Sequence, residues 1–249
     1  ASVWVALHGF TGAGLDFEAL EPALAGKIRW LAPDLPGHGG TPPAADSAAA
    51  LEICTGIFDT LSAAASGAPV GLLGYSMGGR VALHLALSRP AAVRRLVLVG
   101  ASPGIADEAA RRARRREDHR LAESIRTGGL VAFLERWRGH PLIRTQERIP
   151  EPWKTRLRER RERTNRAEGL AGALRTLGTG RLPPLWDRLA ELAMPVDLVT
   201  GADDPKFHAI AEKMRDRMPR SHRIVVPSAG HAAHLENPEA FISQLPAFP

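Results

Sequence analysis

A serine between two glycines stands where a short apolar run meets a helix-forming segment. Residues 72–73 lead into Gly74-Tyr75-Ser76-Met77-Gly78, and residues 81–87 favour a helix. Because glycine has no Cβ, the two glycines allow strand and helix to approach closely at a sharp bend. The pattern predicts a nucleophile elbow that exposes the Ser76 hydroxyl and directs the Met77 N–H at a developing oxyanion.

Two further side chains follow in the chain order that such a serine requires. Asp204 comes just after one late apolar run, and His231 follows the next run and a glycine. At the ends of parallel strands both side chains would meet Ser76, with His231 as the base and Asp204 orienting its imidazole. Asp203 stays as the second candidate for the acid, because either neighbouring carboxylate could turn inward.

The loop after the first apolar run is the other half of the predicted site. His8-Gly9-Phe10 ends a short run that reads as a buried strand. Beside such an elbow, the loop after an early strand supplies a second oxyanion N–H. We predict that Phe10 gives this N–H and that Met77 gives the other.

Apolar runs alternate with helix-forming segments at both ends of the chain. The alanine-rich stretch 46–66 has the spacing of an amphipathic helix. The alternation predicts an α/β fold, a doubly wound and mostly parallel sheet with helices on both faces, formed by residues 1–104 and 186–249. The runs expected to be strands are 3–7, 28–32, 70–73, 96–99, 195–200 and 224–226.

Between residues 105 and 185 the apolar runs give way to arginine-rich sequence. This stretch holds 20 Lys and Arg against 11 Asp and Glu, and the remainder holds 13 against 16, so the net charge of +6 arises here. We predict a helical insertion over the sheet and call residues 105–185 the cap. Its apolar residues at helical spacing are Leu121, Ile125, Leu130, Phe133, Leu134 and Trp137.

Two kinds of acidic ligand suit the charge of the cap, a nucleic acid and a small molecule. Glu117, Asp118, Glu159 and Glu162 interrupt any continuous phosphate-binding stripe, and no nucleic-acid motif accompanies the arginines. Most of the arginines are expected on solvated helix faces, paired with nearby acidic residues. The few that face a closed site would bind carboxylates, so we predict a small substrate with several carboxylates and no nucleic-acid partner.

Composition limits where the protein works. No run approaches the ~20 apolar residues of a membrane span, and the N-terminus enters a strand without a basic stretch or cleavage site. The single cysteine, Cys54, excludes an intrachain disulfide and fits a buried helix position. We predict a cytoplasmic protein without membrane association. His231 and His234 lack a third ligand at suitable spacing, so we predict no metal site.

The elbow, the loop 8–10 and the late acid and histidine resemble those of proteins with the α/β-hydrolase fold. Within that fold the chain is similar to the family of 2-succinyl-6-hydroxy-2,4-cyclohexadiene-1-carboxylate synthases, the pyruvate-eliminating enzymes of menaquinone biosynthesis. The narrower resemblance spans nearly the whole chain, cap included. It rests on residues 74–80, 133–137, 174–180, 185–186, 206–207 and 230–238.

This resemblance implies a lyase that needs no cofactor. The triad serine would act as a base on a cyclohexene bearing succinyl, carboxylate and enolpyruvyl groups, and pyruvate would leave. The substrate-binding residues that it implies are Tyr75, Arg80, Arg114, Trp137 and Arg163.

Motif chemistry alone leaves two other functions open. A serine hydrolase, whether an esterase, a thioesterase or a carbon–carbon bond hydrolase, would use the same triad with Ser76 attacking a carbonyl. A non-catalytic protein would use the basic cap to hold an acidic partner, but the intact set of Ser76, Asp204 and His231 argues against it. We expect a monomer or a weak homo-oligomer.

Overall fold

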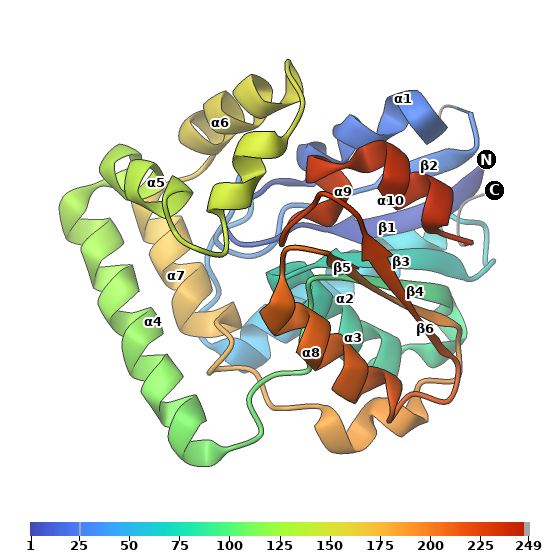
Figure 1. The fold of residues 1–249 in the computed structure, drawn as a ribbon. Helices are drawn as coiled ribbons and strands as arrows, with labels where there is room; N and C mark the ends of the chain where they lie inside the picture. Colours follow the sequence, from blue (N-terminus) through green and yellow to red (C-terminus); the bar gives the residue numbers. More distant parts are fainter. Residues whose placement is uncertain (25, 247–249) are drawn as a thin grey trace.

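The computed structural model describes residues 1–24 and 26–246, and a single parallel sheet organises them (Figure 1). Its six strands lie in the order β2-β1-β3-β4-β5-β6, and every neighbouring pair is parallel. The predicted doubly wound α/β fold is confirmed. The strands are β1 Ser2–Leu7, β2 Ile28–Leu31, β3 Val70–Tyr75, β4 Val93–Val99, β5 Val196–Gly201 and β6 Ser221–Val226.

Alternate residues of the strands build two apolar cores, one on each face of the sheet. Val5 and Leu7 belong to one core, whereas Trp4 and Ala6 belong to the other. Successive strand residues point to opposite faces, so a strand covered on both sides needs a continuous apolar run. This requirement explains why the strands could be recognised as short apolar runs.

Helices cover both faces (Figure 1). One face carries α2 Ser47–Ala63, α3 Met77–Ser88, α8 Pro205–Arg215 and the 3-10 helix η4 Trp186–Glu191, and Cys54 is buried there as predicted. The other face carries the 3-10 helix η1 Gly14–Leu20, with α1 Glu21–Leu24, α9 Ala233–Glu236 and α10 Pro238–Gln244. A further 3-10 turn, η2 Pro90–Ala92, precedes β4.

The cap segment is helical, as its apolar spacing predicts, and lies to one side of the sheet (Figure 1). Phe133 and Leu134 pack with residues of two other cap helices in an apolar cluster separate from the two sheet cores. Phe10, from the loop after β1, packs against this cluster and joins cap to body. The elements are α4 Glu108–Gly128, α5 Leu130–Arg138, η3 Arg144–Arg148, α6 Trp153–Thr164 and α7 Ala167–Leu177.

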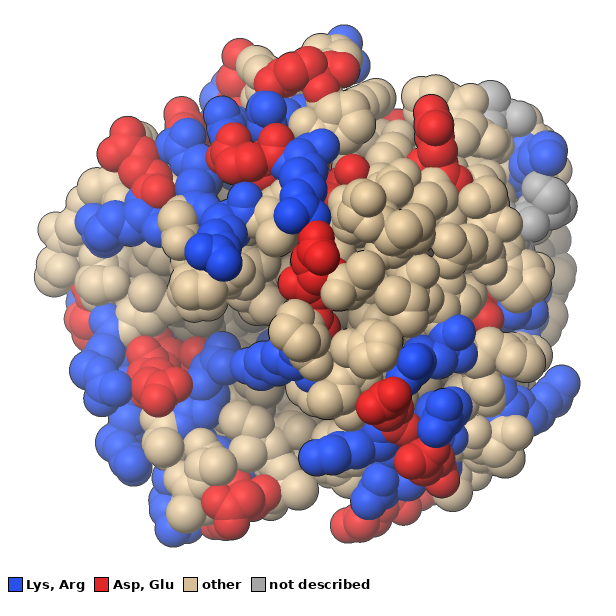
Figure 2. All heavy atoms as spheres, viewed as in Figure 1, with Lys and Arg blue, Asp and Glu red and all other residues tan. Residues whose placement is uncertain are grey.

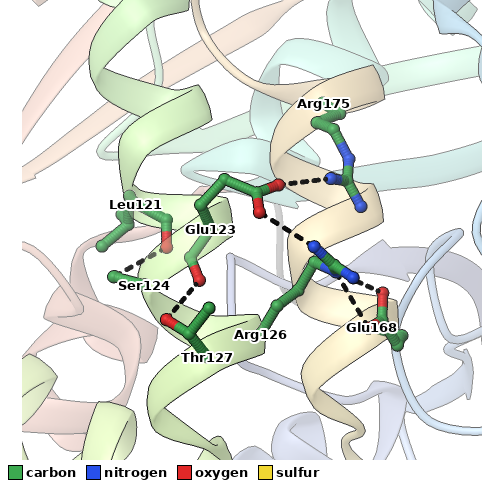
Figure 3. A network of polar contacts seen from close by, with 7 residues as sticks. All are labelled: Leu121, Glu123, Ser124, Arg126, Thr127, Glu168 and Arg175. Carbon is green, nitrogen blue, oxygen red and sulfur yellow. Dashed lines mark hydrogen bonds and ion pairs between the residues drawn. The ribbon is translucent and has the colours of Figure 1, made fainter.

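Many cap arginines form ion pairs on the surface. Glu123 accepts from Arg175 at 3.1 Å and from Arg126 at 2.8 Å, and Arg126 also bonds Glu168 at 3.0 Å, which links α4 to α7 (Figure 3). Lys and Arg gather over the cap with acidic side chains between them (Figure 2). Exposed pairs of this kind contribute little to stability, about 0–1 kcal/mol each.

The strand order places a crevice at the carboxyl edge of the sheet. The chain leaves β1 toward β2 on one side and later continues from β3 to the other side, so the loops after β1 and β3 diverge. Ligands of open α/β sheets bind at such a reversal. Within the described residues, no helix combines the length and apolar character that crossing a bilayer requires.

Candidate active site

Ser76 lies at the turn between β3 and α3, where the backbone takes the left-handed value φ 50°. A Cβ at Gly74 would lie 2.6 Å from the Gly78 carbonyl oxygen, and a Cβ at Gly78 would lie 2.2 Å from the Leu7 carbonyl oxygen. The Ser76 N–H donates to the carbonyl of Val99 at 2.9 Å. The two glycines therefore permit the predicted elbow, and β4 holds it in place.

Ser76, His231 and Asp204 form a chain of hydrogen bonds. The His231 Nε2 is 3.0 Å from the Ser76 Oγ, and the His231 Nδ1 is 2.7 Å from the Asp204 Oδ2. The carboxylate accepts from Nδ1–H, which leaves Nε2 free to accept the serine proton. Both His231 and Asp204 are buried, so this hydrogen bond is shielded from solvent.

The neighbouring carboxylates Asp203 and Asp204 face opposite ways. Asp203 is exposed and forms an ion pair with Arg148 from η3. Asp204 is turned inward, and its Oδ1 also accepts from the Phe207 N–H at 3.3 Å as the N-cap of α8. The structure thus brings Asp204 to His231 and leaves the second candidate, Asp203, on the surface.

The two predicted oxyanion donors line the same cavity as Ser76. Met77 is the first residue of α3, so its N–H has no acceptor within the helix. The loop after β1 packs directly on the elbow, because a Cβ at Gly9 would lie 2.6 Å from the Tyr75 ring and 3.5 Å from the Ser76 Cβ. The Phe10 N–H has no hydrogen-bond acceptor among the described residues.

Glu236 holds the loop that carries His231, and the sequence predictions missed it. The buried carboxylate accepts from the Gly230 N–H at 2.7 Å, the Ala232 N–H at 3.1 Å and the Thr145 hydroxyl at 3.0 Å. Donors on both sides of His231 are thus tied to one side chain. Its place in the 230–238 motif is the sequence signal that marks it.

A cavity of about 190 Å³ opens above Ser76. Four of the five predicted substrate-binding residues line it: Tyr75, Arg80, Arg114 and Trp137. Lys206, from the first turn of α8, contributes a further positive charge. The cavity thus combines Ser76 with several positively charged side chains, a setting that suits an anionic ligand.

Arg80 from the body and Arg114 from the cap both line the cavity, and the charge of Asp118 acts on both. The Arg114 Nε donates to the buried Asp118 at 2.7 Å, and an Arg80 Nη donates to the Leu177 carbonyl at 3.2 Å. Burial, and then the nearby charge of Arg114, lowers the pKa of Arg80 to about 10. Arg80 is still charged at neutral pH, and a bound anion would restore the stabilisation that burial removes.

Arg163 does not lie where the resemblance implies. It is exposed on α6 and does not line the cavity. Arg161 on the same helix points inward instead, donating to the Gln146 Oε1 at 2.9 Å, and the Gln146 Nε2 lies 3.4 Å from the Tyr75 hydroxyl. The buried Leu157 marks the inner face of α6, and Arg161 follows it by four residues, one helical turn.

Aromatic rings form the roof of the cavity. The Trp137 ring meets Phe10 edge-on at 5.6 Å and stacks with Phe133 at 5.7 Å. The buried Trp137 Nε1–H has no acceptor among the described residues, so it is free to bond a ligand. Burial raises the pKa of the neighbouring Tyr75 hydroxyl, which therefore stays protonated as a donor.

His234 is packed among aromatic rings. It lies 4.7 Å from the Tyr75 ring and 5.7 Å from the Phe17 ring, and burial lowers its pKa to about 3. Within the described residues, no three His, Cys, Asp or Glu side chains are placed to hold a metal ion.

Known proteins are similar to this chain over nearly its full length. The model of the alpha/beta hydrolase family matches residues 4–244. A Bacillus subtilis protein provisionally named as a 2-succinyl-6-hydroxy-2,4-cyclohexadiene-1-carboxylate synthase is 38% identical, with 95% of this chain and 86% of that protein aligned. The enzyme of that name from Serratia proteamaculans is 33% identical, covering 99% and 91%.

A solved structure gives the same result for the fold. The structure of MenH from S. aureus superposes with a TM-score of 0.87 at 31% sequence identity, covering 96% of this chain and 90% of that one. The chain belongs to the alpha/beta hydrolase family, and within it resembles the 2-succinyl-6-hydroxy-2,4-cyclohexadiene-1-carboxylate synthases.

Proposed function

We propose that this protein is a cofactor-free lyase of menaquinone biosynthesis, a 2-succinyl-6-hydroxy-2,4-cyclohexadiene-1-carboxylate synthase. The observation that carries the proposal is a Ser76–His231–Asp204 chain opening into a cavity lined by Arg80 and Arg114. Its relatives of that name align along the cap as well as the body. The substrate is a cyclohexene that bears succinyl, carboxylate and enolpyruvyl groups.

The triad supplies a base. His231 accepts the Ser76 proton, and the Ser76 oxygen removes the ring proton next to the succinyl ketone, which is the acidic C–H of this substrate. The ketone oxygen becomes an enolate oxygen and accepts from the Phe10 and Met77 N–H groups. As the enolate collapses, the ring double bond shifts, a second ring double bond forms and the ring C–O bond breaks. The enolpyruvyl group leaves as the enolate of pyruvate, which takes up a proton at carbon.

The cap supplies recognition. We assign residues 105–185 to a cap that closes over the body formed by 1–104 and 186–249. Its Arg114, with Arg80 from the elbow helix, binds substrate carboxylates, and Trp137 covers the ring. The protonated Tyr75 hydroxyl donates a hydrogen bond to the substrate from the body side of the cavity. Arg161 replaces Arg163 in this assignment, because it bonds Gln146, whose amide nitrogen lies 3.4 Å from the Tyr75 hydroxyl at the cavity.

The triad is tested by pyruvate release from the enolpyruvyl substrate. Ser76→Ala and His231→Ala should each lower kcat by at least ~10³-fold, the scale of losing a triad member. Ser76→Ala should keep the thermal stability of the wild type within a few degrees, because it removes only a hydroxyl at the cavity wall. Pyruvate release near the wild-type rate in either variant would remove the triad from the mechanism.

A hydrolase that acts on an acidic small molecule is the second candidate, because the same triad and oxyanion donors serve an attacking serine. The two reactions differ in whether Ser76 becomes acylated. The cytoplasmic location and the monomeric or weakly associated state stay predictions.

A further inference from the structure

The peptide between Gly9 and Phe10 is held from one side. The Gly9 carbonyl accepts from the Gly12 N–H at 3.0 Å and from the His8 Nδ1–H at 2.8 Å. The His8 Nε2 accepts from the Leu35 N–H at 3.0 Å, which fixes the neutral Nδ1–H form. In a trans peptide the N–H points away from the carbonyl, so these two donors set the direction of the Phe10 N–H.

The next residue, Thr11, is held from both sides. Its backbone lies at φ 69°, a left-handed value that a β-branched residue rarely adopts. The Thr11 N–H donates to the His38 Nε2 at 3.3 Å, and the Thr11 carbonyl accepts from the Asn165 Nδ2 at 3.0 Å. A strained residue persists only where its surroundings over-determine it, and here both of its peptide groups are bonded to buried side chains.

Asn165 comes from the cap, whereas the two histidines come from the body. It ends α6 and is 1% exposed, and its amide nitrogen also donates to the Arg161 carbonyl at 3.1 Å. Since both partners are carbonyl oxygens, the side chain of Asn165 must present its amide nitrogen, and not its oxygen, to them. The same helix thus presents Arg161 toward Tyr75 and bonds the loop that carries Phe10.

We propose that Asn165, His38 and His8 are positioning residues that hold the Phe10 N–H in the oxyanion site, so that docking of α6 sets the geometry of catalysis. The inference rests on the proposed function for its reaction but concerns the loop, and any chemistry with an oxyanion at Ser76 would depend on it. Loosening the loop leaves Arg80 and Arg114 in place, because they come from α3 and α4. The loss therefore falls on the chemical step.

The first test uses Asn165→Ala and a matched variant, Arg160→Met. Arg160 also joins α6 to the body, donating to Glu18 at 2.8 Å and pairing with Asp16 at 3.6 Å, but within the described residues it forms no hydrogen bond or ion pair with residues 8–12. Asn165→Ala should lower kcat for pyruvate release about 10- to 100-fold with KM within about 3-fold, since one oxyanion donor is worth about 10²–10³ when wholly lost. Arg160→Met should keep kcat within about 3-fold. Equal losses in both variants, or a loss confined to KM, would overturn the proposal.

We call Asn165, His38 and His8 the clamp. The second test asks whether the hydrogen bond from the Thr11 N–H to His38 contributes to it, by removing and then restoring the acceptor. His38→Leu removes the acceptor of the Thr11 N–H, whereas His38→Gln returns an oxygen near the position of Nε2. His38→Gln should recover at least about 10-fold of the kcat that His38→Leu loses, if the leucine variant folds. If it does not, the Asn165 pair decides alone.

A fluorophosphonate that phosphonylates Ser76 makes the test independent of the natural substrate, because its phosphoryl oxygen occupies the oxyanion site. If Asn165→Ala is labelled more slowly than Arg160→Met, the positioning role of the clamp is supported. If the wild-type protein at the same time releases no pyruvate, the proposed lyase function is wrong. Unchanged labelling of Asn165→Ala together with an unchanged kcat would show that the clamp does not position the Phe10 N–H, while the lyase function would stand.

Discussion

At the scale of single residues, two adjacent carboxylates have different surroundings. Asp204 is buried against His231, whereas Asp203 is exposed and paired with Arg148. Asp204→Asn should lower kcat by about 10³–10⁴-fold, because an amide there favours the wrong imidazole tautomer. Asp203→Asn should change kcat by less than about 3-fold. Steady-state pyruvate release decides between them, and a larger loss in the Asp203 variant would show that the acid is wrongly assigned.

A variant of Glu236 tests whether the loop that carries His231 depends on this carboxylate for its position. Glu236→Ala leaves two buried N–H groups unpaired, so His231 should lose its alignment and kcat should fall at least about 10-fold with a small change in KM. The exposed Glu239→Ala is the matched control, with unchanged kinetics expected. Kinetics of Glu236→Ala that equal those of the control would show that the loop is held by other contacts.

At the scale of elements, α6 determines which arginines serve the site. Arg161→Ala should reduce kcat/KM by roughly 30-fold, about 2 kcal/mol, because Gln146 and Tyr75 lose an inward-facing partner. Arg80→Ala and Arg114→Ala should cost about 2–4 kcal/mol, since each faces the cavity.

Arg163→Ala and Arg116→Ala are the exposed controls and should each cost under about 1 kcal/mol in kcat/KM. Arg160 is unsuitable as an exposed control, because it is paired with Glu18. Equal and small losses at all five arginines would mean that the cap acts only as a diffuse positive field.

The same helix shows what the sequence predicts and what it does not. Strands buried on both faces must be continuous apolar runs, and the elbow needs its glycines at fixed offsets, so both could be recognised locally. Helix α6 has charges around most of its circumference, with Leu157 as its one buried residue. Its rotation is set by packing against the body, so the sequence alone does not show which of its arginines turn inward. The role of Glu236 could not be predicted from the sequence, because its partners are backbone groups of its own loop and a distant threonine.

At the scale of the whole molecule, buried histidines link folding to pH. Burial lowers the pKa of His8, His38 and His234, the last from 6.5 to about 3. Between these values the unfolded chain binds protons that the folded chain does not, so stability is lost as the pH falls below 6.5. Each such group contributes up to about 1.4 kcal/mol per pH unit.

His234→Gln should make the acid side of the stability curve shallower by up to about 1.4 kcal/mol per pH unit, measured by urea unfolding from pH 6.5 to 4.5. The exposed His222→Gln should leave the slope unchanged. A slope for His234→Gln that matches the wild type would show that His234 does not contribute to the acid instability.

The proposed lyase reaction depends on the triad acting as a base, and one experiment tests this directly. The wild-type protein is mixed with the enolpyruvyl cyclohexene substrate, and pyruvate, the conjugated diene product and the intact protein mass are followed through turnover. We predict one pyruvate for each diene and an unmodified Ser76 at every time point, because a base leaves no covalent intermediate. Accumulation of an acyl group on Ser76, or release of succinate in place of pyruvate, would contradict the lyase function and establish a hydrolase.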